Sequence, residues 1–500
     1  MSWPRTAFVL VALCLVIGAS GGTAWAVDGD ASQSDRVGNE TTDVPPDPDE
    51  DRIGWEGGYW YNESIDVDQY DGLSDAELQR YKYRTMARLE RIRGLEFTDD
   101  VAIEFIGPGE VEDRIEGNIT QFRGTGQQWE ALFVIGEDRN AERVLLGTLV
   151  GSVAGWAAEE GSETVVLITD DPSEPTVPPT LLAHELVHVL QHQQFDLSAE
   201  RYQRATLDGE HAKDAVVEGE ASYLDSVYEQ YCTNGSWDCA DERPFATGPD
   251  VGVEYGLFPY LQAPYTLGGE YVSRLVDRGG FDAVDAAHRN PPEYSVTALH
   301  GRQAETASQA GIAPSSPLSV PDRSADGWTR QGGPDRVGAM GLTAILGDRA
   351  LAWRNGVLYA YANGSADGYV WETRWSNATT AQRFLDAYRD EIRSKDGVNV
   401  SAGVWQIPDG PFADAFALDR TGDTVRIVNA PSVGALSAVH DSPSDPDGAD
   451  AGSTVDAGSQ TTASSAEQTT AADGSGPGFG FIAALVAVFV AIAAAKRSAV

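Results

Sequence analysis

Hydrophobic and polar positions along the chain predict a mixture of strands and helices. Residues 164–169 (TVVLIT) form a nearly continuous apolar run of the length expected for a buried strand, and a second strand is expected at residues 101–106. Residues 152–158 are also apolar, but so short a run does not distinguish a strand from a helix. A turn is expected at residues 159–162, which join this run to the strand at 164–169.

Helices are indicated by capping residues and by an apolar period of three to four residues. Ser74 and Glu77 form a capping box before a periodic segment, so a helix is expected to begin there. Leu182, Leu186 and Val189 recur on one face after a proline-rich approach, which predicts a half-buried helix. Further helices are expected at 204–231, 266–288, 342–352 and 378–393, and strands at 357–362 and on both sides of residues 421–423.

The helix that contains Leu186 also carries the pentapeptide HExxH. His184 and His188 lie one turn apart on the same face, so that both imidazoles can reach one metal ion. Glu185 lies beside them, where a carboxylate can take a proton from a metal-bound water. The pentapeptide alone also fits a helix with two surface histidines, and its surroundings decide between the two interpretations.

A zinc site that keeps one position open for water needs a third protein ligand. The metzincin pattern would place a third histidine at position 194, which is Gln, and this class is excluded. His192 lies on the same helix, and three ligands from one straight helix would fit a tetrahedral ion poorly. Glu218 is the preferred candidate because it belongs to a second predicted helix, and Glu220, two positions further on, is its main rival.

Three segments resemble a prokaryotic family of gluzincin peptidases that is similar to the peptidase-MA-like group. They are HELVHVLQHQQFDL (184–197), VVEGEASY (216–223) and APYTLGGEYV (263–272). The resemblance implies that His184, His188 and Glu218 bind zinc and that Glu185 is the catalytic base. It also implies a zincin-like catalytic region over residues 51–300, with the HExxH helix under a small sheet.

The resemblance extends from Ile53 to about residue 430 and looks closest to haloarchaeal surface proteins. One departure stands inside the motif, because His192 occupies a position where the family usually has Asp. This casts doubt on an indirect role for position 192, but not on the ligand set. Overall we expect an α+β protein in which residues 301–435 form a C-terminal α+β extension of the catalytic region.

The charge of the chain restricts its partners. The formal net charge is −42, from 77 acidic and 35 basic residues, and only four of the basic residues are lysines. An acidic excess with few lysines resembles the proteins of halophiles. Nucleic acids and anionic lipid headgroups are excluded as partners because their phosphates would be repelled. A disordered acidic protein is excluded as well, since 42% of the residues are hydrophobic and 12 are tryptophan.

The N-terminus has the features of an export signal. Residues 1–26 contain Arg5, an apolar stretch at 7–17 and the Ala-Trp-Ala cleavage pattern at 24–26, and residues 27–50 resemble a disordered acidic leader. Outside the cytosol, Cys232 and Cys239 are expected to form a local disulfide, although a redox or metal role stays open. Glycosylation motifs begin at Asn39, Asn62, Asn118, Asn234, Asn363, Asn377 and Asn399.

The C-terminus is expected to attach the protein to the cell surface. Residues 441–476 are rich in Ser, Thr, Ala and Asp and are typical of a solvated stalk. Residues 477–500 hold Pro-Gly-Phe, an apolar run at 481–495 and Lys496-Arg497, and they resemble the PGF-CTERM sorting signal of archaeal surface proteins. The resemblance implies cleavage and attachment of a lipid. A transmembrane anchor is the alternative, for which fifteen apolar residues are few.

These patterns together predict a cell-surface zinc peptidase that hydrolyses peptide or protein substrates with a metal-activated water. Tyr265 and Tyr223 are the candidates for stabilising the oxyanion, although tyrosines in such segments are often core residues. The alternative is a surface binding or adhesion protein whose zinc site is structural or vestigial.

Overall fold

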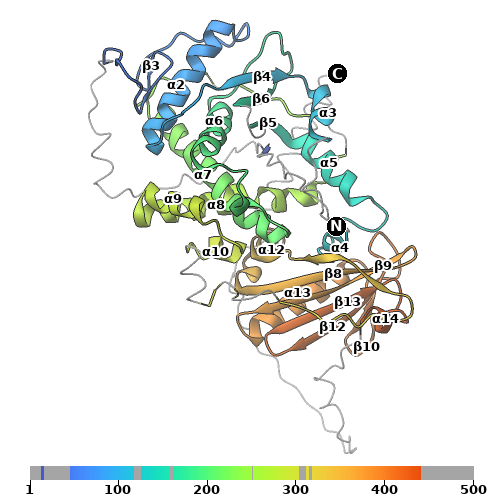
Figure 1. Ribbon diagram of the computed structural model, residues 1–500. Coiled ribbons are helices and arrows are strands. Elements are labelled where there is room, and N and C mark those ends of the chain that lie inside the picture. Colours follow the sequence, from blue (N-terminus) through green and yellow to red (C-terminus); the bar gives the residue numbers. More distant parts are fainter. Residues whose placement is uncertain are drawn as a thin grey trace, which may run out of the picture. The chain divides into compact units, whose positions relative to one another are not determined.

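The computed structural model describes residues 13–15, 45–116, 126–157, 163–241, 243–249, 252–302, 311–312, 314 and 318–440 (Figure 1). Several predicted features lie outside these residues. They are nearly all of the export signal and the acidic leader, the turn at 159–162, the stalk, the sorting signal, and Asn39 and Asn118. The described residues to His440 belong to one compact unit and have the expected α+β composition.

A four-stranded sheet of order β1-β5-β6-β4 lies beside the HExxH helix. Strands β4 (Ala102–Ile106) and β6 (Thr164–Ile168) are parallel, and β5 (Val153–Ala157) runs antiparallel to β6. The strands at 101–106 and 164–169 are therefore confirmed. Within the undecided run at 152–158, Val153–Ala157 form strand β5, and Ser152 is the last residue of helix α5 (Ala141–Ser152).

The short strand β1 (Leu13–Leu15) pairs antiparallel with β5. It lies within the segment that was predicted as an export signal.

Helix α6 (Pro179–Phe195) packs against this sheet, α7 (Leu207–Thr233) packs against α6, and α8 (Phe258–Gly279) packs against α7. Helix α6 begins with proline in its first turn and runs beside β5 and β6 (Figure 1). Helices α7 and α8 approach closely where Gly219 faces Gly268, since a Cβ atom on either glycine would press into the backbone of the opposite helix.

The predicted helix at 266–288 is wrong in its extent. The chain forms two helices here, α8 and α9 (Phe281–Arg289), because Gly280 between them has φ 62° and ends the first helix. Helix α8 also begins earlier than predicted, at Phe258, with Pro259 in its first turn.

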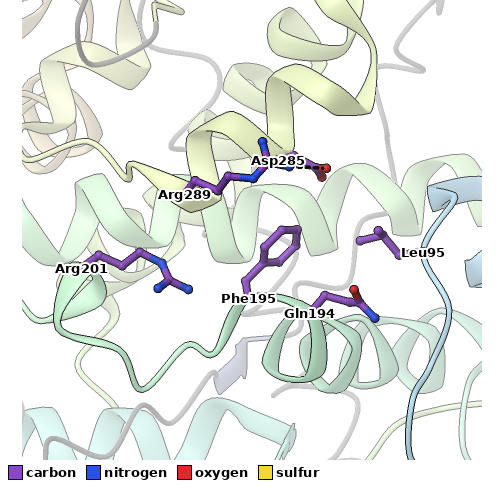
Figure 2. Close-up of a pocket in the computed structure, with 6 residues that line it drawn as sticks. All are labelled: Leu95, Gln194, Phe195, Arg201, Asp285 and Arg289. Carbon is purple, nitrogen blue, oxygen red and sulfur yellow. Dashed lines mark hydrogen bonds and ion pairs between the residues drawn. The ribbon is translucent and has the colours of Figure 1, made fainter.

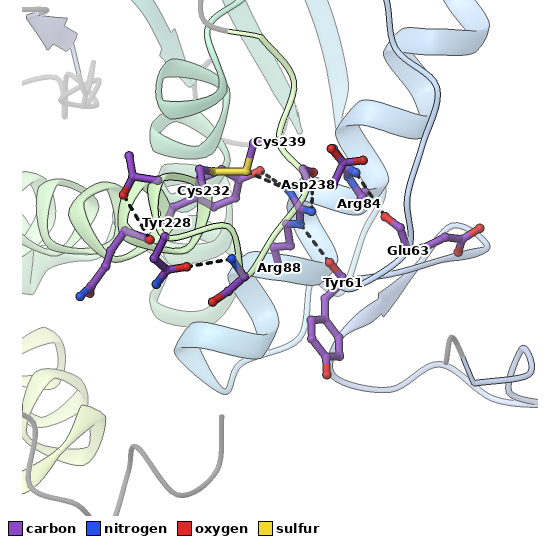
Figure 3. The surroundings of a disulfide bond; sticks show 12 residues. Tyr61, Glu63, Arg84, Arg88, Tyr228, Cys232, Asp238 and Cys239 are labelled. Atoms are coloured by element: carbon purple, nitrogen blue, oxygen red, sulfur yellow. Dashed lines mark hydrogen bonds between the residues drawn. A yellow bond between two sulfur atoms is a disulfide. The ribbon is translucent and has the colours of Figure 1, made fainter. Parts of the chain in front are cut away.

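Helix α2 (Asp75–Arg93) packs on α6 and α7 and carries the predicted capping box, in which the Ser74 side chain accepts from the Glu77 backbone N–H. Arg88 of α2 donates to the backbone oxygens of Tyr61 and Asp238, which joins the hairpin β2 (Trp55–Glu56) and β3 (Tyr59–Trp60) to the end of α7 (Figure 3). Beside it Cys232 and Cys239 form a disulfide, as predicted.

The C-terminal part of the unit is a seven-stranded antiparallel sheet of order β10-β11-β12-β13-β9-β8-β7. Alternate residues of its central strands face two different cores. Trp371 packs against Phe384 of α13 (Ala378–Ser394) on one face, and Val370 belongs to a core with Leu436 of α14 (Leu436–Val439) on the other. The strands are β7 (Thr329–Asp335), β8 (Trp353–Asn363), β9 (Ala366–Trp375), β10 (Val398–Ser401), β11 (Val404–Gln406), β12 (Ala415–Thr421) and β13 (Thr424–Ala430).

The hairpin around Gly422, the helix at 378–393 and the strand at 357–362 are confirmed. The predicted helix at 342–352 is instead α12 (Gly338–Leu346) followed by the 3-10 helix η4 (Gly347–Ala352), and α12 ends because Gly347, the first residue of η4, has φ 67°. The remaining short helices are η1 (Pro108–Glu110), α3 (Val111–Glu116), α4 (Gln127–Ala131), η2 (Glu200–Tyr202), η3 (Tyr255–Leu257) and α10 (Ser295–Leu299).

None of the helices among the described residues has the length and apolar character needed to cross a membrane.

Candidate metal centre

Helices α6 and α7 bring His184, His188 and Glu218 to one point. The Nε2 atoms of the two histidines are 3.2 Å apart, and Glu218 Oε2 lies 3.5 Å from His184 Nε2 and 3.2 Å from His188 Nε2. The two imidazoles converge because a spacing of four residues places them on the same helix face. Two histidines and one glutamate, with their ligand atoms within 4.8 Å of one another, are a donor set that fits zinc.

The other ring nitrogen of each histidine has its own hydrogen-bond acceptor. His184 Nδ1 lies 2.6 Å from Asp225 Oδ2, and His188 Nδ1 lies 2.9 Å from Gln191 Oε1. These acceptors favour the tautomers that carry the proton on Nδ1, so that each Nε2 lone pair faces the centre.

The centre is deeply buried, and its charges act strongly on one another. Burial alone would raise the pKa of the Glu218 carboxyl, but His188 and His184 outweigh it and lower this pKa to about 2. Burial likewise lowers the pKa of His188, and the opposing charge of Glu218 raises it above the ordinary value. Even without an ion, Glu218 is therefore held as a carboxylate that faces two imidazoles.

Glu185 lies in the same space but does not belong to the ligand trio. Its side chain is fully buried, and neither carboxylate oxygen has a hydrogen-bond partner among the described residues. Burial raises its pKa to about 7. Gly155 of β5 passes directly over it, because a Cβ atom there would lie 3.3 Å from Glu185 Oε1.

The rival glutamate, Glu220, faces away from the two histidines. It forms a buried ion pair with Arg93, and its Oε2 lies 2.7 Å from His288 Nε2. The charge of Arg93 and these hydrogen bonds outweigh burial and hold the pKa of Glu220 well below its ordinary value. Gln191 links Glu220 to the metal centre by hydrogen bonds. Its Nε2 donates to Glu220 Oε2 at 2.8 Å, and its Oε1 accepts from His188 Nδ1.

The remaining candidate ligands also lie elsewhere. Glu210 pairs with Lys213, and the His211 ring lies 4.1 Å from that of Tyr260. His192 is half-buried near the end of α6 and is not part of the trio.

The two candidate tyrosines have different surroundings. The half-buried ring of Tyr265 on α8 is nearly parallel to that of His184, with 6.0 Å between the ring centroids. Tyr223 packs instead against Phe281 of α9, with 6.3 Å between the centroids. Of the two, Tyr265 is the one beside a candidate ligand.

Three residues of the centre were missed in the sequence. Asp225 follows Glu218 by seven residues, two helical turns, and Gln191 follows His188 by three, so helical spacing could have pointed to both. Gly155 had no such signal, because only the pairing of β5 with β6 places it over Glu185.

A separate pocket of about 330 Å³ lies at the C-terminal end of α6. Its walls are Leu95, Gln194, Phe195, Arg201, Asp285 and Arg289 (Figure 2). It contains none of the trio, and its Phe195 ring stacks on His288 at 4.3 Å, on the side where Glu220 is held. The pocket therefore adjoins the Glu220 ion pairs rather than the two HExxH histidines.

Five of the predicted glycosylation sites are within the described residues. Asn234, Asn363, Asn377 and Asn399 are exposed, whereas Asn62 is half-buried. Asn377 also caps α13 by accepting from the Thr380 backbone N–H.

The family described as "Domain of unknown function (DUF8575)" matches residues 329–440, which begin with β7 and end after α14. The match covers the seven-stranded sheet and leaves the centre on α6 and α7 outside. No curated protein and no solved structure matches the chain.

Proposed function

We propose that this protein is a zinc-dependent peptidase of gluzincin type with a zincin-like region around α6 and α7. The observation that carries the proposal is the convergence of His184 Nε2, His188 Nε2 and Glu218 Oε2, each histidine oriented by an acceptor at Nδ1. The unpaired carboxylate of Glu185 beside this trio favours a hydrolytic centre over a purely structural metal site.

Zinc held by these three side chains would polarise the scissile carbonyl and lower the pKa of its bound water to about 7. Glu185 would accept the proton of this water and then deliver it to the leaving amine. A buried carboxyl whose pKa is raised to about 7 can do both near neutral pH, since neither transfer is strongly uphill. Tyr265, beside His184, is the candidate donor to the developing oxyanion.

Strand β5 supports a peptide as substrate. Its outer edge can pair with an extended segment, as the antiparallel partner β1 illustrates, with Leu13 opposite Trp156. A peptide bound in the same way would lie beside Gly155, the residue of β5 that is next to Glu185. Backbone pairing of this kind gives affinity that depends little on the substrate sequence.

The test is cleavage of casein or a peptide library by the Glu185→Gln variant, in high salt because of the acidic surface. We expect cleavage to fall by a factor of about 10² to 10⁴ while zinc content is retained, since Glu185 moves protons but does not bind the ion. Glu229→Gln, an exposed change on α7, is the matched control and should cleave normally. Undiminished cleavage by Glu185→Gln would overturn the assignment.

The burial of the centre favours a second candidate, a surface binding or adhesion protein with a structural zinc site. Glu185 and His188 are both 0% exposed. In that case a chelator would lower the melting temperature, yet a peptide library would remain uncut by the wild-type protein. Metal-dependent cleavage of any library member would eliminate this candidate.

We extend the proposal to the location of the protein, on the sequence signals at its two ends. The protein is exported and held at the cell surface by its C-terminal segment, either through a lipid after cleavage or through a spanning helix. Mass analysis of the mature protein tests this. A peptide containing Ala495 and Lys496 in the surface fraction would exclude cleavage, and an intact residue 1–26 segment would exclude the export signal.

A further inference from the structure

A second group of ionisable side chains lies far from the histidines, where α4 meets the seven-stranded sheet. Glu130 belongs to α4, Glu137 to the turn after it, and Asp414 directly precedes β12. One ligand oxygen of each lies within 4.8 Å of those of the other two. Residues almost three hundred positions apart therefore place three carboxylates in one small space.

The turn after α4 is firmly docked on the sheet. The Phe133 ring lies 5.2 Å from Tyr388, 5.5 Å from Phe412 and 5.9 Å from Phe416. Glu137 N donates to the backbone oxygen of Pro411 at 3.0 Å. The carboxylates are thus held together by packing and backbone bonds, against their mutual repulsion.

Two of the three carboxylates are removed from water, and their polar atoms are not all satisfied. Glu130 is 4% exposed and Asp414 is 1% exposed. Asn429 Nδ2 donates to Glu130 Oε1 at 3.2 Å and to Asp414 Oδ2 at 2.8 Å. Asp414 Oδ1 and Asn429 Oδ1 are buried and have no hydrogen-bond partner among the described residues. Leaving such atoms unpaired is costly, so a partner is expected.

The charges around the three carboxylates also indicate a bound partner. After burial, the strongest influences on the Glu130 carboxyl come from Asp414, Glu137 and Asp367, all of them acidic. Burial and the same neighbours raise the pKa of Glu130 well above its ordinary value. The Glu137 carboxyl is only partly removed from water, and this partial burial together with Asp367 and Asp414 raises its pKa to about 9. Either protons or a bound cation must therefore neutralise part of the negative charge of these carboxylates.

We propose that Glu130, Glu137 and Asp414 bind one Ca²⁺ ion, which joins the turn after α4 to the start of β12. Carboxylate and amide oxygens are the ligands that calcium prefers, and no imidazole or thiolate belongs to the cluster. Oxygens on opposite sides of one calcium ion, at ~2.4 Å from it, lie ~4.8 Å apart, so three oxygens that all lie within 4.8 Å of one another can bind a single ion. Glu137 is exposed, which gives the ion a path of entry and room for water ligands.

The test is calorimetric titration of the full chain with CaCl₂, after removal of divalent ions and in KCl buffer. We expect one saturable site and a rise in melting temperature with calcium, because a ligand of the folded state stabilises it. Asp414→Asn and Glu137→Gln should each weaken binding about tenfold or more. Glu254→Gln, which removes a nearby carboxylate bonded to Arg139, is the control and should bind calcium normally.

A protonated, ion-free cluster predicts the opposite pattern. The wild-type protein would then show neither a calcium heat nor a shift in melting temperature, and the proposal would be overturned. Equal calcium binding by the wild type and by Glu137→Gln would also overturn it, as adsorption to the acidic surface would explain the binding. Because Glu137 is exposed, this variant folds without rearrangement of the core and keeps the test decisive.

Discussion

The histidine cluster on α6 and α7 and the carboxylate cluster at the turn after α4 place buried acids in opposite electrostatic surroundings. Glu218 faces two imidazoles, and its pKa falls to about 2. Glu130 faces other carboxylates, and its pKa rises well above the ordinary value. Both are nearly excluded from water. Burial raises the pKa of both carboxyls, and the charges that face each one either outweigh this rise, as at Glu218, or add to it, as at Glu130.

The two clusters also differ in how they are held. The histidine cluster stands on two long helices, and Asp225 and Gln191 orient its rings through direct hydrogen bonds. The carboxylate cluster depends on a five-residue helix and a turn docked on a sheet. The first geometry is supported locally, and the second by contact between distant parts of the chain. Changes at one cluster should therefore leave the other intact.

The largest expected effect is a loss of bound zinc that occurs on replacement of Glu218 but not of Glu220, the two neighbouring glutamates of α7. Glu218→Ala should reduce bound zinc from one ion per chain to almost none, because two histidines remain as ligands. Glu220→Gln, Glu210→Gln and His211→Gln should retain zinc, although the loss of the Glu220 charge leaves Arg93 paired with Asp285 alone and should lower the stability of the fold. Metal analysis of the folded fractions measures this, and full zinc in Glu218→Ala would assign the third ligand to another residue.

A smaller effect is expected at the carboxylate that orients His184. Asp225→Asn should weaken zinc binding about 10- to 100-fold, since the ring loses its charged acceptor. Competition with a zinc chelator gives the affinity, and calcium titration of the same variant should match the wild type. A parallel loss of calcium binding would show that the clusters are coupled, contrary to their separate supports.

The smallest effect concerns the docking of the turn after α4. A Cβ atom at Gly136 would overlap the backbone oxygen of Pro411, so Gly136→Ala should shift the turn and cost about 1–3 kcal/mol in unfolding free energy. Calcium affinity should fall while zinc content stays the same. Gly434→Ala, where a Cβ atom meets nothing within 4 Å, is the control for denaturant unfolding. If the two variants were equally stable, the close approach of Gly136 to Pro411 would not contribute to this docking.

The sequence predicted helices, strands and turns correctly where all the residues that determine the element lie within the element itself. The Ser74 capping box begins α2, the apolar run at 164–169 is β6, and Gly422 turns the hairpin of β12 and β13. Signals failed where a single residue interrupts a continuous apolar period. Gly280 and Gly347 adopt left-handed φ angles and end helices that periodicity alone would continue.

What the sequence by itself determined is the part of the centre with fixed helical spacing. His184, Glu185 and His188 lie within one turn and a half, and any helix there would place both imidazoles on one face. The choice of Glu218 over Glu220 needed the packing of α7 against α6, which turns one glutamate to the histidines and the other to Arg93. The carboxylate cluster was invisible in the sequence, because only the docking of α4 on the sheet overcomes the repulsion between residues 130, 137 and 414. Spacing along a helix is a local property, whereas the approach of like charges has to be imposed by the rest of the fold.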